Sequence, residues 1–344
     1  MGGLSIQLLD GSKKESYKDF VDQCPHAMLY HGWEYKEFLK SLLAVDEHYL
    51  LVVNEAGKIS GALPLLCKNG PYGNVYNSLP FYGSNGGILS NDEESFNFLV
   101  EGYNKFVRET NLASSTVISN PLKTEDSYIH ITQNYTDYRI GQFSTIKFEE
   151  RHEDSLMNMF HYKTRNMVRK GIKEGVKVFE ENEAIDFVID THEKNMSAIG
   201  GKPKPRSFFK LFPTFYKPGI DYKIYTAKIN GKAIAALLLF YFNDTVEYYS
   251  PVIVEEFRDK QALSLIIYEA MIEASKRGYK RWNWGGTWAS QGGVYTFKKR
   301  WGTYDVNYHY YTLLKNESIL TKSKGELLKH YDNFFVIAFN ELKN

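Results

Sequence analysis

The residues most suited to chemistry lie near the end of the chain, where glycines follow a hydrophobic segment and cations follow the glycines. Residues 279–284 read as a strand that leads into Trp-Gly-Gly-Thr at 284–287. After two further glycines, Phe-Lys-Lys-Arg-Trp occupies 297–301. Glycine lets a backbone approach a ligand closely, and lysine and arginine bind negatively charged groups. We therefore expect this stretch to bind an anionic ligand.

A second group of cations lies at 163–173. If this segment forms a helix, Arg165, Arg169 and Lys173 stand four residues apart and share one face. Gly175 would end that helix. One interpretation is a solvated charged face, and the other is a site for a phosphate, a pyrophosphate or the backbone of tRNA. Because the cations are local and the net charge of the chain is only +1, we favour a single anion site over a uniformly basic surface.

A third segment of interest is 79–88, where an expected strand runs into Tyr82, Asn85 and two glycines. It matches neither the Walker pattern nor Gly-x-Gly-x-x-Gly. We interpret it either as a structural turn or as the wall of a ligand groove.

The composition excludes several classes of protein. The 344 residues are 43% hydrophobic and 24% charged, which is ordinary for a globular chain of about two domains. No stretch reaches the ~18 apolar residues of a membrane span and no signal-peptide pattern is present, so we expect a cytoplasmic protein. The cysteines and histidines lack metal-binding spacing, and we expect no metal. Without a recognisable nucleophile and base pair, a reaction that needs no covalent enzyme intermediate fits better.

The chain carries an internal repeat. Residues 49–63 and 223–237 each read as a strand, a turn with Gly-Lys and a second strand. Each is followed by an extended segment, a long helix and a further strand, which favours two copies of one unit. We therefore predict an α/β fold of two domains, 1–149 and 150–344, the second ending in an amphipathic closing helix at 327–342.

In their order along the chain, these segments resemble the FemABX family of aminoacyltransferases and, more broadly, GNAT-like acyltransferases. The resemblance rests on the cationic helix, the Gly231-Lys232 hairpin, the run from Tyr248 to Arg258 and its helix, and the Gly-Gly and Phe297-Lys298 stretch. It covers nearly the whole chain. It implies two tandem GNAT-like domains with mixed sheets and a substrate groove between them.

Two features depart from the pattern that the resemblance implies. Some family members carry a coiled-coil arm in the second domain, but 171–222 has no long heptad pattern, so we expect no arm. GNAT enzymes hold the pyrophosphate of coenzyme A with glycines at a helix start, and residues 258–263 lack those glycines. This second departure disfavours acetyl-CoA as the donor.

The resemblance also implies roles for individual residues. Lys298 would stabilise the reacting carbonyl or hold a phosphate of the donor, and Tyr248 or Glu247 lies where a proton has to move. Gly285 and Gly286 would give the donor room. The residues expected to contact the acceptor or to line the groove are Trp33, Lys36, Tyr82, Asn85, Arg165, Arg169 and Phe297.

The activity that the resemblance implies is transfer of an activated acyl group to an amine. The co-substrate would be aminoacyl-tRNA or acyl-CoA, with no permanently bound cofactor, and the acceptor a small-molecule or lipid-linked amine of a cell-wall or glycan precursor. A lipid-linked acceptor would bring the protein to the inner face of the membrane. The rival interpretation is a non-catalytic, degenerate GNAT pair that binds a nucleotide-sugar or glycan. The donor, the acceptor, the general base and the oligomeric state stay open.

Overall fold

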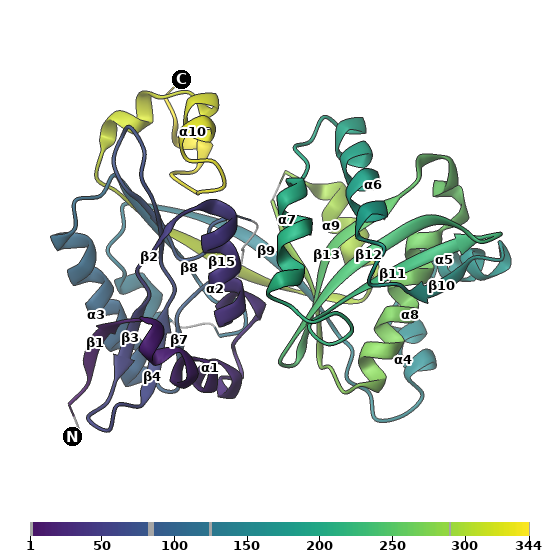
Figure 1. Cartoon of the computed structure of the whole chain (residues 1–344), viewed down its shortest axis with the longest axis horizontal. Coiled ribbons are helices and arrows are strands. Elements are labelled where there is room, and N and C mark those ends of the chain that lie inside the picture. The colour runs from purple at the N-terminus through teal and green to yellow at the C-terminus, as the bar shows by residue number, and fades with distance from the viewer. Residues whose placement is uncertain (1–2, 82–85, 124–125, 289, 344) are drawn as a thin grey trace. The chain divides into compact units, whose positions relative to one another are not determined.

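The protein forms two compact units (Figure 1). They are seen in a computed structural model that describes residues 3–81, 86–123, 126–288 and 290–343. The first unit comprises Met1–Arg139 and Asn307–Asn344, and the second comprises Ile140–Val306. None of the helices in these described ranges is long and apolar enough to cross a membrane.

The first unit is built from short strands and amphipathic helices. Its strands are β1 (Ser5–Leu8), β2 (Asp46–Glu47), β3 (Leu50–Val53), β4 (Ile59–Leu63), β5 (Leu66–Lys68), β6 (Val75–Asn77), β7 (Leu89–Ser90) and β8 (Ser114–Ile118). Its helices are α1 (Lys14–Gln23), α2 (Trp33–Leu43), α3 (Glu93–Glu109) and α10 (Lys324–His330). Two strands, β9 (Tyr135–Thr145) and β15 (Thr303–Leu314), run from one unit into the other.

The strands of the first unit form one antiparallel sheet, in the order β1-β3-β4-β7, and part of a second sheet. The predicted hairpin is confirmed as β3 and β4, with Gly57 at a φ of 77° in the turn. Helix α3 packs on this sheet and buries Phe96, Leu99 and Tyr103. Its first turn is capped by Asp92, whose side chain accepts a hydrogen bond from the backbone N–H of Ser95.

The second unit is a single mixed sheet with helices on both faces. Its remaining strands are β10 (Lys177–Glu180), β11 (Tyr222–Ile229), β12 (Lys232–Phe242), β13 (Thr245–Ile253) and β14 (Arg281–Thr287). Its helices are α4 (His152–Met159), α5 (Tyr162–Lys173), α6 (Ile185–Ala198), α7 (Arg206–Leu211), α8 (Ala262–Lys276) and α9 (Gly292–Lys299). The strand order is β10-β11-β12-β13-β14-β9, and only β13 and β14 are parallel.

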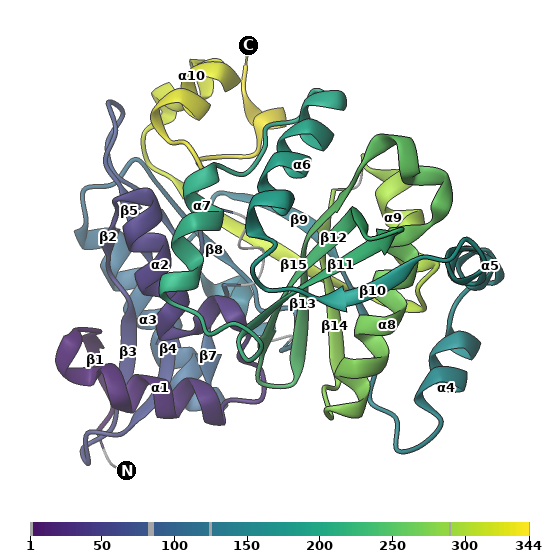
Figure 2. The ribbon, with the colours of Figure 1, turned by 45° about the vertical axis from the view of Figure 1, so that its right-hand side comes forward.

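Alternation along β12 explains how both faces are covered. Leu237 and Leu239 share a buried core with residues of α8. Phe240, which points to the opposite face, packs on Phe212 after α7 and on Tyr249 of β13, with ring centroids 5.3 and 5.1 Å apart. Period-two alternation of large apolar residues therefore places α8 on one side and α6 and α7 on the other (Figure 2).

Several predicted elements of the second unit are confirmed. The hairpin of β11 and β12 turns at Asn230 and Gly231, both with positive φ. Helix α5 ends before Gly175, whose φ is 73°. The fully described stretch 171–222 contains α6, of 14 residues, and the shorter α7, so the coiled-coil arm is absent as expected.

The C-terminal part of the chain differs from the prediction in two ways. Residues 307–344 belong to the first unit, whereas we placed them with the second, because the last part of β15 pairs with β8. The expected helix at 327–342 is shorter, since α10 ends at His330. Beyond it Asn333 has a φ of 69°, and the backbone N–H of Phe335 donates to Asn77 Oδ1 at 2.7 Å. Contacts with the first unit thus replace helical hydrogen bonds.

Candidate functional site

The candidate site lies in the second unit, where β13 and β14 separate. Their parallel pairing joins Thr245–Glu247 to Arg281–Asn283 and goes no further. Strand β13 continues to Ile253 along β12, with a bulge near Leu238. Strand β14 continues along β9 after its own irregularity between Asn283 and Gly286. Beyond this point the facing edges of β13 and β14 no longer pair with each other, and an extended ligand can form hydrogen bonds along such an edge.

The two glycines of β14 have different reasons to be glycine. Gly285 has a φ of 73°, a conformation that other residues adopt only with strain, and its N–H donates to Asn283 Oδ1 at 2.8 Å. Gly286 stands opposite Gly141 of β9, so neither strand places a side chain there. The end of β14 is therefore a partly buried stretch of backbone shaped by glycine.

Lys298 points from α9 onto this backbone. Its ammonium donates to the carbonyl oxygens of Gly285 and Gly286, both at 3.2 Å, and to Thr287 Oγ1 at 2.8 Å. The side chain is only 7% exposed, and no carboxylate contacts it within the described residues. Burial among uncharged oxygens lowers the pKa of Lys298 to about 8.

Polar side chains extend this arrangement in both directions. On one side, Thr287 Oγ1 lies 3.2 Å from Gln142 Oε1. On the other, Asn283 Nδ2 donates to Glu247 Oε2 at 2.8 Å, and Glu247 is 2% exposed. A buried chain of hydrogen bonds thus runs from Glu247 through Asn283 and the β14 backbone to Lys298. Sequence reasoning missed Asn283, although a polar residue between Trp282 and Trp284 is itself a signal.

Two predicted aromatic residues lie beside the same strand. The ring centroid of Tyr248 is 4.9 Å from that of Trp284, and burial raises the pKa of Tyr248 above its ordinary value. This phenol is therefore protonated at neutral pH and is a weaker acid than an ordinary tyrosine. Phe297 is 36% exposed and contacts Trp284 edge-on, with centroids 6.1 Å apart.

In the first unit, the structure gives Lys36 a different environment from the one expected. Lys36 is 1% exposed and forms ion pairs with Glu37 and Glu47, while its ammonium lies 3.9 Å from the ring centroid of Trp33. Two carboxylates neutralise the charge that we expected to bind an acceptor phosphate. Of the other predicted groove residues, Tyr82 and Asn85 lie outside the described residues.

The two arginines predicted to act together on α5 have separate environments. Arg165 Nη1 donates to the carbonyl oxygens of Phe160, at 2.5 Å, and Met157, at 3.4 Å. It therefore caps the end of α4. Arg169 is exposed and has no ion pair within the described part of the chain. Of these two arginines, Arg169 is therefore the more accessible to a ligand.

The start of α8, where the GNAT pattern would place a pyrophosphate, is rich in acidic residues. Glu255, Glu256 and Asp259 precede it. The two cations of this turn are already paired, Arg258 with Glu255 at 2.6 Å and Lys260 with Glu174 at 2.8 Å. Acidic neighbours and occupied cations make this helix start a poor site for a phosphate.

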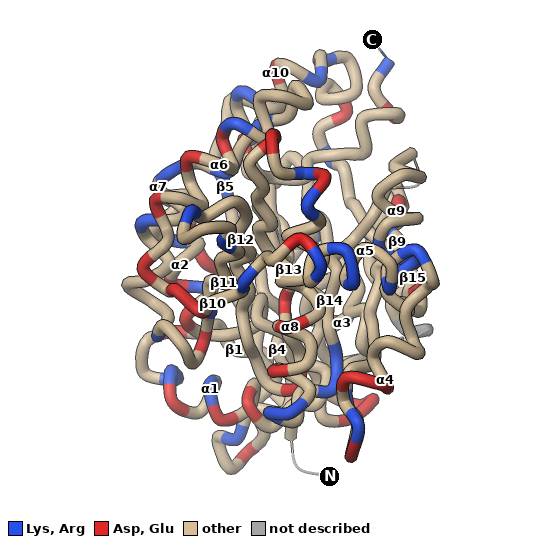
Figure 3. The backbone as a smooth tube through the Cα atoms, turned by 90° about the vertical axis from the view of Figure 1, so that its right-hand side faces the viewer, with Lys and Arg blue, Asp and Glu red and all other residues tan. Residues whose placement is uncertain are grey.

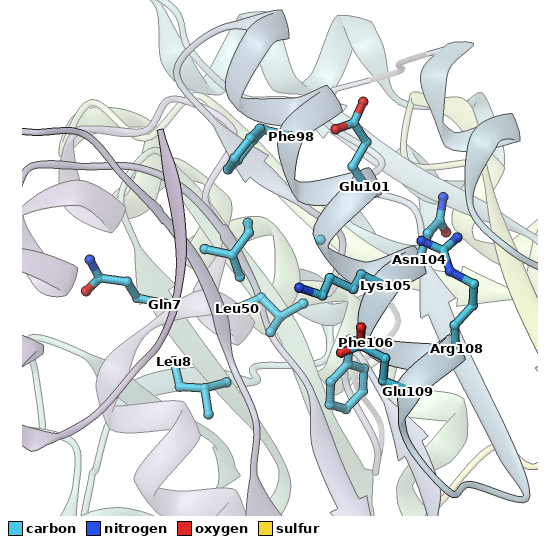
Figure 4. A pocket seen from close by; sticks show the side chains of 12 residues that line it. Gln7, Leu8, Leu50, Phe98, Glu101, Asn104, Lys105, Phe106, Arg108 and Glu109 are labelled. Carbon is cyan, nitrogen blue, oxygen red and sulfur yellow. The ribbon is translucent and has the colours of Figure 1, made fainter. Parts of the chain in front are cut away.

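The first unit contains a hollow of about 810 Å³ between β1 and α3 (Figure 4). Figure 4 shows Lys105 pointing into it, above apolar side chains such as Leu50. Acidic and basic residues both line it, so its charge does not select a class of ligand. Across the described ranges, no three His, Cys, Asp or Glu side chains gather as a metal site requires.

Comparison with known proteins supports the fold. Residues 159–299 match the acetyltransferase (GNAT) domain family. No curated protein matches the chain in sequence. Among solved structures, FemX superposes with a TM-score of 0.72 at 15% identity, covering 92% of this chain and 98% of FemX.

Two further structures are similar over most of the chain. A conserved protein of unknown function from Bacteroides thetaiotaomicron has a TM-score of 0.60 at 9% identity, covering 91% of this chain and 100% of its own. L-PGS from Bacillus licheniformis has a TM-score of 0.54 at 10% identity, with 89% and 92% covered. The chain therefore has an acyltransferase-type GNAT fold like that of FemX, and this likeness confirms the resemblance to the FemABX-like group at the level of the fold.

Proposed function

We propose that the protein is an N-acyltransferase that forms an amide between an activated acyl group and an amine acceptor. The observation that carries this proposal is Lys298, a buried ammonium held by uncharged oxygens at the point where β13 and β14 separate. A positive charge without a carboxylate partner is suited to stabilising negative charge that develops during a reaction. The tandem GNAT fold supports the same reaction class.

The reaction follows from general chemistry and these positions. The amine nitrogen attacks the carbonyl carbon of an ester or thioester, and negative charge develops on the carbonyl oxygen. The two longer hydrogen bonds of Lys298, at 3.2 Å to Gly285 and Gly286, are those that a developing oxyanion would replace. The new C–N bond forms as the bond between the acyl carbon and the carrier breaks.

Two proton transfers accompany this step. We assign to Glu247 the proton that leaves the amine, because its carboxylate is buried and held by Asn283. The same carboxyl group, once it has taken that proton, would return it to the departing hydroxyl or thiol. Phe297 and Trp284 would exclude water from the intermediate.

The acidic start of α8 bears on the choice of donor. An acyl-CoA that bound its pyrophosphate there would face Glu255, Glu256 and Asp259. We therefore favour an aminoacyl ester of tRNA over acyl-CoA, with a cell-wall or glycan amine as acceptor.

The experiment is a transfer assay with purified full-length protein. Radiolabelled aminoacyl-tRNA and acyl-CoA are each offered with a panel of amines that includes amino-sugar nucleotides and lysine-containing peptides. We expect amide product that depends on both donor and acceptor. If neither donor is consumed above its rate of hydrolysis over the whole panel, the proposal fails. Calorimetric binding of a nucleotide-sugar without turnover would instead favour the degenerate binding pair.

A further inference from the structure

A second group of cations in the second unit lies apart from the hydrogen bonds of Lys298. Lys163 at the start of α5 and Lys299 and Arg300 at the end of α9 line a hollow of about 380 Å³, together with Tyr162 and Tyr295. Figure 3 shows basic positions, in blue, along α5. The hollow thus brings together one cation of the segment 163–173 and two cations that follow Lys298.

The lining of the hollow is strongly positive. Lys299 lies 3.2 Å from Asp305, whose other carboxylate oxygen accepts a hydrogen bond from Tyr295 at 2.6 Å. Lys163 and Arg300 have no ion pair within the described residues, and no carboxylate lines the hollow. Even with Lys299 neutralised, two full positive charges are available to a ligand, which suits a phosphate group.

Side chains supply the binding groups of the hollow, because the backbone N–H groups at the start of α5 already have partners. The backbone N–H of Lys163 already donates to His161 Nδ1 at 3.3 Å, and that of Thr164 donates to His161 O at 2.9 Å. Tyr162, in contrast, is 54% exposed; His161 packs against its ring, with centroids 4.4 Å apart, and the exposed part of the ring is open to a ligand. Bases stack on such rings. Cations beside an exposed aromatic ring are the chemistry that recognises a nucleotide.

We propose that the hollow between α5 and α9 binds a nucleotide, with its phosphate groups on Lys163 and Arg300 and its base on Tyr162. Helix α9 points Lys298 inward and ends in the outward Lys299 and Arg300, so the nucleotide would lie about one helix diameter, ~10 Å, from the end of β14. Its assignment as the carrier of the acyl donor rests on the proposed function. Coenzyme A and the 3′ end of tRNA both present a nucleotide.

The test is calorimetric titration of the full-length protein with ADP, and separately with a short RNA hairpin that has a single-stranded 3′ end. The variant is Lys163→Gln combined with Arg300→Gln. The matched control is Lys177→Gln, which removes an exposed cation of β10 that does not line the hollow. For whichever probe binds the wild type, we expect the Kd to rise at least tenfold in the double variant and less than twofold in the control. Circular dichroism and thermal melting check that both variants are folded.

The outcomes separate the sources of the nucleotide and the two proposals. Binding of ADP alone points to a coenzyme, and binding of the hairpin with a steep salt dependence points to RNA. No binding of either probe, or equal affinity in wild type and double variant, overturns the nucleotide site. If wild type transfers acyl groups with an unchanged donor KM in the double variant, the site fails while the proposed function stands. If probe binding is lost in the variant but wild type transfers nothing, the site stands and the proposed function fails.

Discussion

Two buried lysines, Lys36 in the first unit and Lys298 in the second, show how the same residue type serves different purposes. Both are almost inaccessible, at 1% and 7% exposure, and both were predicted to be functional. Lys36 is surrounded by the carboxylates of Glu37 and Glu47. Lys298 contacts only carbonyl and hydroxyl oxygens.

The difference lies in what balances the charge. Glu37 and Glu47, the latter shared with Lys40 at 2.9 Å, balance the charge of Lys36 within the fold, so that charge presents little field to a ligand. The oxygens around Lys298 solvate its charge without cancelling it, and the cost of burial appears as a pKa lowered to about 8. A buried charge that is solvated but not neutralised is the better candidate for catalysis.

The largest effect is expected from Lys298→Met on amide formation. Loss of the charge that stabilises the oxyanion should lower kcat by roughly 10²–10³-fold, the range seen when one such donor is removed. The matched control is Lys280→Met, which removes an exposed lysine paired with Asp244 on the surface. An unchanged kcat in Lys298→Met, measured on folded protein, would remove Lys298 from the mechanism.

Lys36→Met should show the opposite pattern, with a large effect on stability and a small one on turnover. Removing the ammonium takes a partner from Glu37 and Glu47, which are 33% and 23% exposed, and leaves Glu47 paired with Lys40. The change should therefore cost about 2 kcal/mol of unfolding free energy in urea titrations. Replacing both glutamates by glutamine in the same variant should recover most of this loss. A stable Lys36→Met protein with a raised acceptor KM would return Lys36 to the binding site.

The pH dependence of stability provides a third contrast. Because the pKa of Lys298 is about 8 in the folded protein and about 10.5 in the unfolded chain, the unfolded chain binds more protons between these values. Unfolding free energy should therefore rise with pH across this window, by up to roughly 3 kcal/mol, relative to Lys298→Met measured in parallel. Identical slopes in the two proteins would contradict the lowered pKa.

The smallest expected effect is a difference in stability between variants of the two arginines of α5. Arg165→Gln should lose hydrogen bonds to the carbonyls that end α4 and cost about 1 kcal/mol of stability, whereas Arg169→Gln should cost almost nothing. Urea midpoints of the two variants make the comparison. Equal midpoints would mean that the α4 cap contributes nothing.

Local patterns carried the successful predictions. The glycine turns of both hairpins and the four-residue spacing of the cations in α5 are properties of short segments, and so is the glycine-rich end of β14. The features that the sequence did not predict depend on partners that are distant in the sequence. Glu47 reaches Lys36 from another element, and Arg165 turned inward because α4 ends beside it. The last part of β15 joined the first unit through its pairing with β8, which no local pattern shows.

The most direct test of the contrast is an NMR titration of the lysine side chains with ¹³C-labelled Cε, with the Lys298 signal assigned by its absence in Lys298→Met. Burial among uncharged oxygens predicts that Lys298 titrates with a midpoint near pH 8. A Lys298 signal that shows no titration below pH 10 would contradict the account. It would mean that a carboxylate, or water, balances this charge as fully as Glu37 and Glu47 balance that of Lys36.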